Sequence, residues 1–219
     1  MIRFDIISLF PEAFSYLETS LIKKAQEKNI LKIKIWNPRD FTFDKHKTVD
    51  DKPYGGGPGM VIKFEPIYLA LKKAKDEFKT KKRKIILTHP AGKIFDQKLA
   101  KKLSNEKQII IICGHYEGID ARIEKFVDLK ISLGKFMLSG GEIPAMAIID
   151  AVSRFVPGFL HNPLSLEEKR FGRLYSLPVY TRPQEINING KKLKVPKVLL
   201  SGNHKLIEEW RKKHLKKIL

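Results

Sequence analysis

The sequence predicts an α/β protein in which helices cross over a parallel β-sheet. Up to about residue 156, apolar residues repeatedly alternate over a short segment and then recur at the 3.6-residue spacing of a helix. Three glycine clusters, at residues 54–60, 116–120 and 139–142, lie next to apolar segments and indicate turns that come close to a ligand. The apolar density falls after Asn162, so a smaller second unit is expected there.

The first sixty residues predict two strands, one helix and a long loop. Residues 2–7 indicate a strand, and residues 31–35, where lysines alternate with apolar residues, indicate a half-exposed one. Pro11 begins a helix between them. The expected apolar face of this helix comprises Phe14, Leu17, Leu21, Ile22 and Ala25. Residues 41–58 are polar and rich in glycine, and a loop of this length is usually functional or disordered.

The alternation of helix and strand continues through the middle of the chain. The expected elements are a helix at 65–78, a strand at 84–88, a helix at 96–103, a strand at 108–113, a short helix at 120–126, a strand at 127–133 and a helix at 144–156. The last helix is apolar on almost every side, which predicts that part of it is covered by a second copy of the chain.

Three predicted loops follow strands and would meet at one edge of the sheet. They are residues 87–90, 113–118 and 133–141. Ligands of parallel sheets bind outside the carboxyl ends of the strands, so the three loops predict a single site. Taken one at a time, Gly114, Gly134 and Gly140 are equally consistent with ordinary turns. Neither G-x-G-x-x-G nor G-x-x-x-x-G-K-[ST] occurs, which favours a ligand held by backbone and apolar walls.

The carboxyl-terminal part differs in composition from the rest of the chain. Asn162-Pro163 interrupts the chain, and residues 165–173 are polar and charged, as in a linker. Asn189-Gly190 predicts a tight hairpin with arms at 186–188 and 192–195. Gly202-Asn203 then predicts the cap of a final helix. The apolar face of that helix is expected to hold Leu206, Ile207, Trp210 and Leu215.

Charge points to a polyanionic partner. The formal net charge is +19 and the isoelectric point is near 9.9, which would attract phosphate backbones over long range. A lysine-rich bias that reflects genome composition or growth temperature would give the same charge. Residues 72–84 and 211–217 concentrate basic side chains, although helices with a lysine face are usually only solvated.

Several classes of protein are disfavoured. No amino-terminal signal pattern precedes the first strand, and the longest apolar stretch is too short to span a membrane, so we expect a cytoplasmic protein without a membrane partner. Cys113 is the single cysteine and follows an isoleucine run, which predicts a buried, inert thiol. No spacing of ligand residues predicts a metal site.

A set of motifs in fixed order resembles the bacterial tRNA (guanine-N(1)-)-methyltransferases of the TrmD type. The resemblance covers nearly the whole chain. It rests on Ile7-Ser8-Leu9-Phe10-Pro11-Glu12, Pro38-Arg39-Asp40-Phe41, the segment 48–60, Cys113-Gly114-His115-Tyr116-Glu117-Gly118-Ile119-Asp120, Leu138-Ser139-Gly140-Gly141-Glu142, Ser153-Arg154-Phe155, Tyr180-Thr181-Arg182-Pro183 and Leu199-Leu200-Ser201-Gly202-Asn203-His204.

The resemblance implies a SPOUT-class methyltransferase that works as a homodimer. Residues 1–161 would form a cofactor-binding domain with a deep trefoil knot, residues 162–180 a linker, and residues 181–219 a small, mainly helical tRNA-binding domain. The knot belongs to the family and cannot be inferred from periodicity. The implied S-adenosylmethionine site comprises Leu87, Thr88, Pro90, Gly114, Tyr116, Glu117, Gly118, Leu133, Gly134, Phe136, Leu138, Gly140, Gly141 and Pro144.

The reaction implied by the resemblance is methylation of N1 of the guanosine immediately 3′ of the tRNA anticodon, with DNA not expected as a partner. N1 of guanine carries a proton at neutral pH, so a base must remove it and a cation must stabilise negative charge on the neighbouring oxygen. Arg154 matches the family's cation and Glu117 a carboxylate near the target; Arg154 in a structural ion pair is the alternative. Whether Mg²⁺ is required for activity is left open. The implied RNA contacts are Asp50, Lys52, Tyr54, Gly55, Gly57, Gly59, Arg182, Asn203 and His204.

One position departs from the family pattern. Counted back from Tyr180-Thr181-Arg182-Pro183, Ser176 occupies the position where the family usually has an acidic general base. Serine cannot remove the proton unaided, and the segment before it is shortened, so Glu167 or Glu168 is the alternative base.

Two other functions stay open at this point: a tRNA-binding homologue with impaired chemistry, and a SPOUT methyltransferase acting on another RNA.

Overall fold

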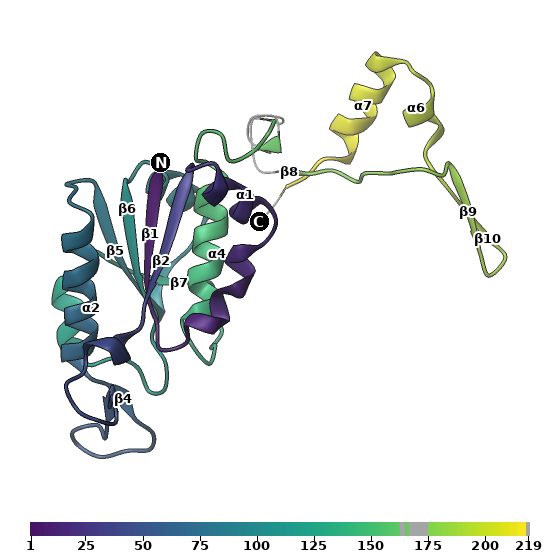
Figure 1. Cartoon of the computed structure of the whole chain (residues 1–219). Helices are drawn as coiled ribbons and strands as arrows, with labels where there is room; N and C mark the ends of the chain where they lie inside the picture. The colour runs from purple at the N-terminus through teal and green to yellow at the C-terminus, as the bar shows by residue number, and fades with distance from the viewer. Residues whose placement is uncertain (163–164, 167–174, 218–219) are drawn as a thin grey trace. The chain divides into compact units, whose positions relative to one another are not determined.

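The computed structural model describes residues 1–162, 165–166 and 175–217. Within this range the chain divides into two compact units, Met1–Leu160 and His161–Leu219, which are described separately. The first unit contains the sheet and its helices, and the second contains short strands and two helices (Figure 1).

The first unit is built on a parallel five-stranded sheet with the strand order β2-β1-β6-β5-β7. Its strands are β1 (Ile2–Ile7), β2 (Leu31–Trp36), β5 (Arg83–Ile94), β6 (Gln108–Ile112) and β7 (Leu129–Ser132). Every residue of β1 and β6 is buried, as expected for strands covered on both faces. The predicted α/β class and parallel sheet are therefore confirmed.

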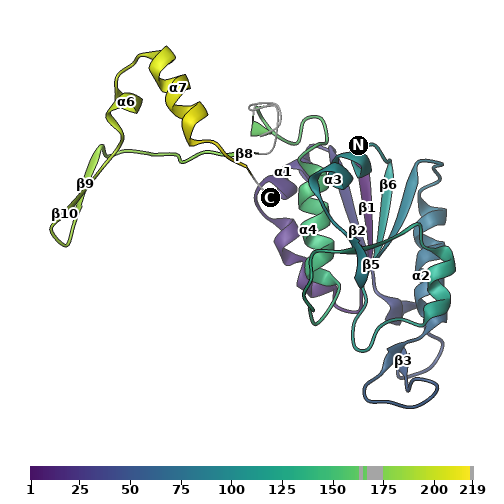
Figure 2. The same cartoon turned by 180° about the vertical axis from the view of Figure 1, so that it is seen from behind.

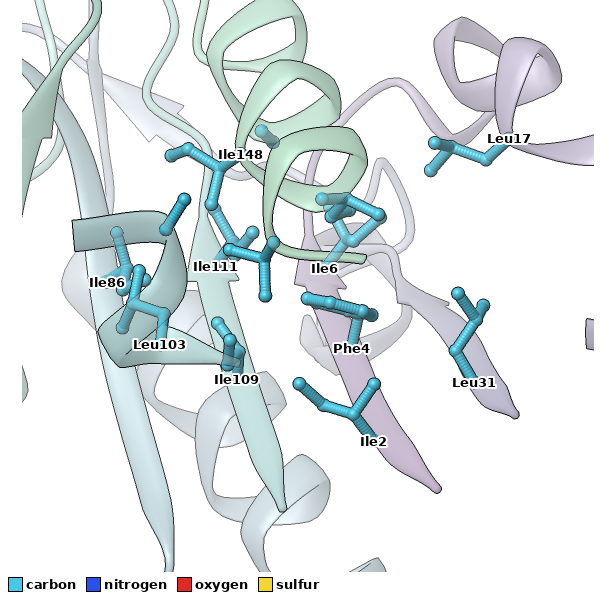
Figure 3. Packing of buried hydrophobic residues seen from close by; sticks show 14 of the residues in the cluster. Ile2, Phe4, Ile6, Leu17, Leu31, Ile86, Leu103, Ile109, Ile111 and Ile148 are labelled. Atoms are coloured by element: carbon cyan, nitrogen blue, oxygen red, sulfur yellow. The ribbon is translucent and has the colours of Figure 1, made fainter. Parts of the chain in front are cut away.

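Helices cover both faces of this sheet (Figures 1 and 2). One apolar cluster joins one face to α2 (Phe64–Glu77) and the 3₁₀ helix η3 (Ala121–Phe126). A second cluster joins the other face to the 3₁₀ helix η1 (Pro11–Glu18), α1 (Ser20–Glu27), α3 (Gln97–Leu103) and α4 (Glu142–Ser153). Figure 3 shows the second cluster, where Ile148 of α4 packs over Ile6 and Ile111. The two packed faces hold the strand ends, and hence the loops after them, in place.

The predicted helix over residues 11–25 is wrong in one respect: it is two helices. Ser20 has φ +50°, a left-handed conformation that interrupts a right-handed helix, and Thr19 before it is extended. The Thr19 hydroxyl donates to the carbonyl of Tyr16 at 2.7 Å and so ends η1. Leu17 is buried, but Leu21, expected on the same apolar face, is 45% exposed.

Strand β5 is longer than the predicted strand 84–88. It pairs with β6 up to Leu87 and continues beside β7 to Ile94, with an irregularity between Thr88 and Lys93. Pro90 lies in the second half, where β5 has lost one neighbour, and so its missing N–H breaks no pairing with β6. The predicted loop 87–90 is consequently the middle of a bent strand.

The predicted loop 41–58 contains short ordered elements. The 3₁₀ helix η2 (Pro38–Phe41) ends at the first residue of this segment, with the Asn37 side chain accepting a hydrogen bond from the amide of Arg39. Strand β3 (Asp50–Asp51) then pairs with β4 (Val61–Ile62), so the glycine-rich residues between them form the tip of a hairpin. Val49 and Ile62 are fully buried and anchor the base of that hairpin.

A buried ionic network lies at the amino end of β1. The guanidinium of Arg3 donates to Asp5 at 2.7 and 2.8 Å and to Glu77 at 2.9 Å. Asp5 also accepts from the indole of Trp36 and the amide of Gln108. Hydrogen bonds from Lys34 and then Arg3 lower the pKa of Glu77 below its usual range. The polar side of β1 is thus buried and paired.

The second unit contains the predicted hairpin and final helix. Strands β9 (Glu185–Ile188) and β10 (Lys191–Lys194) pair across Asn189 and Gly190, both with positive φ. Helix α6 (Lys197–Leu200) precedes α7 (His204–His214), whose amino end is capped by the Asn203 side chain. Leu215 lies just beyond α7 and not on its face. Strands β8 (Tyr175–Ser176) and β11 (Lys216–Lys217) also pair.

Candidate cofactor-binding site

A cavity of about 370 Å³ lies at the carboxyl edge of the sheet. Its walls come from the middle of β5, the loop after β6, the loop after β7 and the start of α4. The residues that line it are Leu87, Thr88, His89, Pro90, Gly114, His115, Tyr116, Glu117, Gly118, Ile119, Ala121, Glu124, Ile131, Ser132, Leu133, Phe136, Met137, Leu138, Ser139, Gly140, Gly141 and Pro144. All three loops predicted to form one site therefore meet there.

Backbone contacts join the two glycine loops of the cavity. The amide of Gly141 donates to the carbonyl of Gly114 at 2.7 Å, and His115 forms an antiparallel bridge with Gly140. A Cβ atom on Gly141 would lie 2.8 Å from Cα of Cys113 and would collide with the hydroxyl of Thr88. Residue 141 must therefore be glycine for the loops to approach each other.

The structure places every predicted cofactor residue but one on this cavity. Gly134 is the exception: it does not line the cavity, and a Cβ there would lie 2.5 Å from the ring of Phe136. The absence of a side chain at Gly134 leaves room for the ring of Phe136. Sequence reasoning missed several lining residues, among them His89, His115 and Met137. Their positions inside the predicted loops were the available signal.

Glu117 connects the cavity to the glycine-rich hairpin tip. Its amide donates to the carbonyl of Met60 at 3.1 Å, and a Cβ on Gly59 would lie 2.6 Å from its carboxylate. Gly55, Gly57 and Gly59 all have positive φ, and Tyr54 beside them is fully exposed. Asp50 lies in β3, and Lys52 is exposed in the turn after it. Of the predicted RNA-binding residues of this unit, Gly59 thus adjoins the predicted cofactor residue Glu117.

Arg154 lies away from the cavity of its own chain. It follows the last residue of α4, whereas Gly141 and Pro144 at the start of α4 line the cavity. Twelve residues of helix separate the two ends, which corresponds to about 18 Å. Figure 1 shows α4 beginning at the edge where the strands end and running back toward the edge where β1 begins. One chain alone does not bring Arg154 and Glu117 together.

The remaining predicted residues belong to the second unit. Ser176 is exposed in β8, opposite Lys216. Arg182 and His204 are exposed, and Asn203 accepts a hydrogen bond from the amide of Leu206 at 3.2 Å as the cap of α7. Glu167 and Glu168, the alternative bases, lie outside the described residues.

Two ionisable groups near the cavity have perturbed pKa values. Burial, and then the charge of Glu142, raise the pKa of the Cys113 thiol well above its usual range, in keeping with the predicted inert thiol. Arg122 donates to Asp120 and lowers the pKa of that carboxyl.

Among the described residues, no group of three or more His, Cys, Asp or Glu side chains could hold a metal ion. In the same part of the chain, no helix is long and apolar enough to cross a membrane.

Fold and site together define a class: an α/β protein whose glycine loops enclose a small-molecule cavity at the carboxyl edge of a parallel sheet, without a phosphate-binding loop. Comparison with known proteins then identifies the family. The model of the family described as tRNA (Guanine-1)-methyltransferase TrmD matches residues 2–218. The chain belongs to this family.

Individual relatives agree over nearly the full length. A tRNA (guanine-N(1)-)-methyltransferase of Carboxydothermus hydrogenoformans is 52% identical over 214 residues, which is 96% of this chain and 81% of the relative. The protein of the same name from Dictyoglomus turgidum is 48% identical over 215 residues, covering 97% and 84% of the two chains. The crystal structure of tRNA (m1G37) methyltransferase from Aquifex aeolicus superimposes with a TM-score of 0.80 at 44% identity, covering 97% of this chain and 88% of that one.

Proposed function

We propose that the protein transfers a methyl group from S-adenosylmethionine to N1 of the guanosine immediately 3′ of the anticodon in tRNA. The observation that carries this proposal is the cavity at the carboxyl edge of the sheet in a chain that belongs to the TrmD family. As a methyltransferase the protein is a transferase, and its substrate is tRNA.

The cavity fits S-adenosylmethionine in size and chemistry. Its volume of about 370 Å³ lies in the range of small-molecule sites. Leu87, Leu133 and Leu138 offer apolar walls for the adenine ring, and Gly114, Gly140 and Gly141 bring backbone amides and carbonyls to the surface. A Cβ on Gly141 would fill part of this space. When bound, the cofactor supplies an electrophilic methyl group on a sulfonium.

The protein's own residues must remove one proton and stabilise the negative charge that develops on the guanine during methyl transfer. Guanine N1 has to lose its proton before or during attack, and the resulting negative charge spreads onto the neighbouring oxygen. Arg154 is proposed to stabilise that charge, and Glu117, which lines the cavity, to hold the target base near the cofactor. Ser176 stands at the position of the proton acceptor but cannot act as one unaided, so the base comes from water or from Glu167 or Glu168.

Homodimerisation would complete the site. Arg154 follows the end of α4, a helix about 18 Å long whose other end lines the cavity of its own chain, so a second copy must supply it if it acts on bound substrate. Apolar side chains around the cavity are also uncovered: Met137 is 76%, Ile143 57% and Phe136 56% exposed. Burying them against a partner would remove the exposed apolar patch. We infer that each cavity is completed by the partner's α4 end.

Recognition of tRNA is proposed to use both units. The net charge of +19 attracts the phosphate backbone. In the first unit the hairpin meets the cavity residue Glu117 at Gly59 and Met60, and its exposed tip with Tyr54 would approach the target base. In the second unit Arg182, His204 and the lysine-rich α7 would contact the anticodon stem, while Asn203 caps α7. Because tRNA is the substrate, the proposed site of action is the cytoplasm.

The proposal is tested by methyl incorporation into defined tRNA transcripts. Transcripts with guanosine 3′ of the anticodon should accept one labelled methyl group per molecule, and transcripts with adenosine at that position should accept none. Arg154→Ala should reduce the rate by about 10²-fold or more, because it removes a cation placed for the transition state. Equal labelling of both transcripts would contradict the proposal and indicate another RNA target.

Ser176 favours one second candidate, a tRNA-binding homologue with impaired chemistry. Its side chain is exposed and has no acidic group. The same assay separates the two functions, because the second candidate would bind both tRNA and S-adenosylmethionine and transfer no methyl group in a single turnover.

A further inference from the structure

Three polar side chains meet beneath the cavity from three separate elements. Ser8 follows β1, His115 lies in the loop after β6, and Glu142 is the first residue of α4. The hydroxyl of Ser8 donates to Oε1 of Glu142 at 2.7 Å and accepts from the amide of Phe10 at 3.0 Å. Glu142 is only 8% exposed, and its position at a helix amino end stabilises its negative charge.

The second oxygen of Glu142 faces His115. Oε2 lies 3.7 Å from Nδ1 of His115, and this buried nitrogen has no hydrogen-bond partner among the described residues. The His115 side chain is nevertheless 26% exposed. Its exposed part therefore belongs to other atoms of the side chain, and His115 lines the cavity.

The ring of His115 is held in place on its faces and edges. It packs against the rings of Phe10 at 4.6 Å and Tyr116 at 5.0 Å between centroids. Gly140 provides the room for this arrangement, since a Cβ there would lie 2.6 Å from Nδ1 and would also collide with the Glu142 carboxylate. Gly140 is thus required for His115 and Glu142 to face each other.

Electrostatics decide which nitrogen carries the proton. A bare Nδ1 lone pair facing a carboxylate would be repelled, whereas an Nδ1–H group would be attracted to it. A proton on Nδ1 leaves Nε2 of the neutral ring as the acceptor. This arrangement resembles catalytic sites in which a carboxylate fixes the tautomer of a histidine.

We propose that His115 contacts the bound cofactor through Nε2, accepting a hydrogen bond from one of its hydroxyl or amino groups. Glu142 and Ser8 are positioning residues that hold the Nδ1 proton and the ring orientation. This inference rests on the proposed function, because it takes S-adenosylmethionine to be the ligand of the cavity.

Two substitutions of His115 separate a ligand contact from a structural role. Asparagine places its amide near the position of Nδ1, and glutamine places its amide near that of Nε2. In calorimetric titrations with S-adenosylmethionine, His115→Asn should weaken binding about tenfold, the cost of losing one hydrogen bond. His115→Gln should stay within about threefold of the parent protein. A purely structural role predicts the reverse order, and that result would overturn the proposal.

Controls distinguish the possible failures. His46→Asn, in an exposed loop, should leave the cofactor affinity unchanged. If the parent protein binds no S-adenosylmethionine, the proposed function fails and this inference with it. If the parent binds and His115→Asn binds equally well, only the inference fails. Thermal melting of each variant shows whether a loss of affinity reflects unfolding.

The tautomer gives an independent test that does not depend on activity. Nitrogen-15 NMR of the parent protein at a pH of about 8.5, where an ordinary histidine is neutral, should show the Nδ1–H form for His115. Glu142→Gln should shift the population toward the Nε2–H form, because glutamine can donate to Nδ1. An Nε2–H form in the parent protein would overturn the proposal.

Discussion

At the scale of single residues, Ser176 has the most direct consequence for chemistry. A well-placed general base contributes about 10² to 10⁴ in rate, and serine cannot supply it. We predict that the single-turnover rate of methyl transfer rises with pH, since the target guanine loses its N1 proton more readily at higher pH. Ser176→Asp should accelerate transfer at neutral pH and flatten that rise. Cofactor affinity should not change, because Ser176 lies outside the cavity lining.

The opposite result would assign the general base to another residue. If Ser176→Asp slows transfer while Glu167→Gln or Glu168→Gln abolishes it, the base lies earlier in the chain. Quench-flow measurement with saturating tRNA provides the rates, and Ser176→Asn provides an uncharged control of the same size as aspartate.

Gly141 and Gly114 both line the cavity and allow a matched pair of alanine substitutions. A Cβ on Gly141 collides with Thr88 and the backbone of Cys113, whereas a Cβ on Gly114 would make only ordinary contacts, the nearest at 3.8 Å from the carbonyl of Thr88. Neither residue has positive φ, so backbone strain does not separate them. We predict that Gly141→Ala loses S-adenosylmethionine binding by tenfold or more and that Gly114→Ala stays within about threefold. Calorimetry measures both, and equal losses would refute the steric argument.

At the scale of elements, Leu17 and Leu21 test the interruption between η1 and α1. Both were expected on one apolar face, but Leu17 is 2% exposed and Leu21 45%. Leu17→Ala should therefore reduce the free energy of unfolding by about 2 to 5 kcal/mol, because it leaves a cavity in the core. Leu21→Ala should cost less than about 1 kcal/mol. Urea unfolding gives both values, and similar costs would mean that the two residues share one buried face.

Helices and strands were predictable where the spacing of apolar residues matches the burial of the segment in the fold. The strands β1 and β6 and the capped helix α3 follow from apolar patterning and from Asp96, whose side chain accepts from the amide of Leu99. The break at Ser20 was not predictable, because a left-handed residue between two helices leaves the apolar spacing almost unchanged. The extension of β5 past Pro90 depends on β6 ending first, which is a property of the sheet and not of the segment.

The site was predictable in its loops but not in its polar interior. The three loops follow from the rule that ligands bind at the carboxyl ends of parallel strands, and their residues from resemblance to the TrmD family. Ser8, His115 and Glu142 lie 107 and 27 positions apart in the sequence, so only the fold brings them together. Burial of Arg3 and Asp5 is similar: both are charged residues of β1, and the fold pairs them inside the protein.

At the scale of the whole molecule, charge should govern tRNA binding and not cofactor binding. Release of counterions makes the logarithm of tRNA affinity fall linearly with the logarithm of salt concentration. S-adenosylmethionine has no phosphate, so its affinity should change little over the same range. Fluorescence titrations between about 50 and 200 mM salt measure both slopes. Equal slopes would show that the basic surface does not bind RNA.

The location of Arg154 gives a second prediction about the whole molecule. If each active site combines the cavity of one subunit with Arg154 of its partner, two defective chains can complement each other. The Arg154→Ala and Gly141→Ala proteins should each have strongly reduced activity alone, when S-adenosylmethionine is too dilute to saturate the cavity of the Gly141→Ala protein. After joint unfolding and refolding, random pairing makes half of the dimers mixed, and each mixed dimer holds one intact site of two, so activity should recover to about a quarter of the parental value. If Arg154 instead served the cavity of its own chain, each chain in the mixed dimer would still carry one defect in its own site. No activity would then return, and light scattering of the refolded mixture would show whether dimers had formed at all.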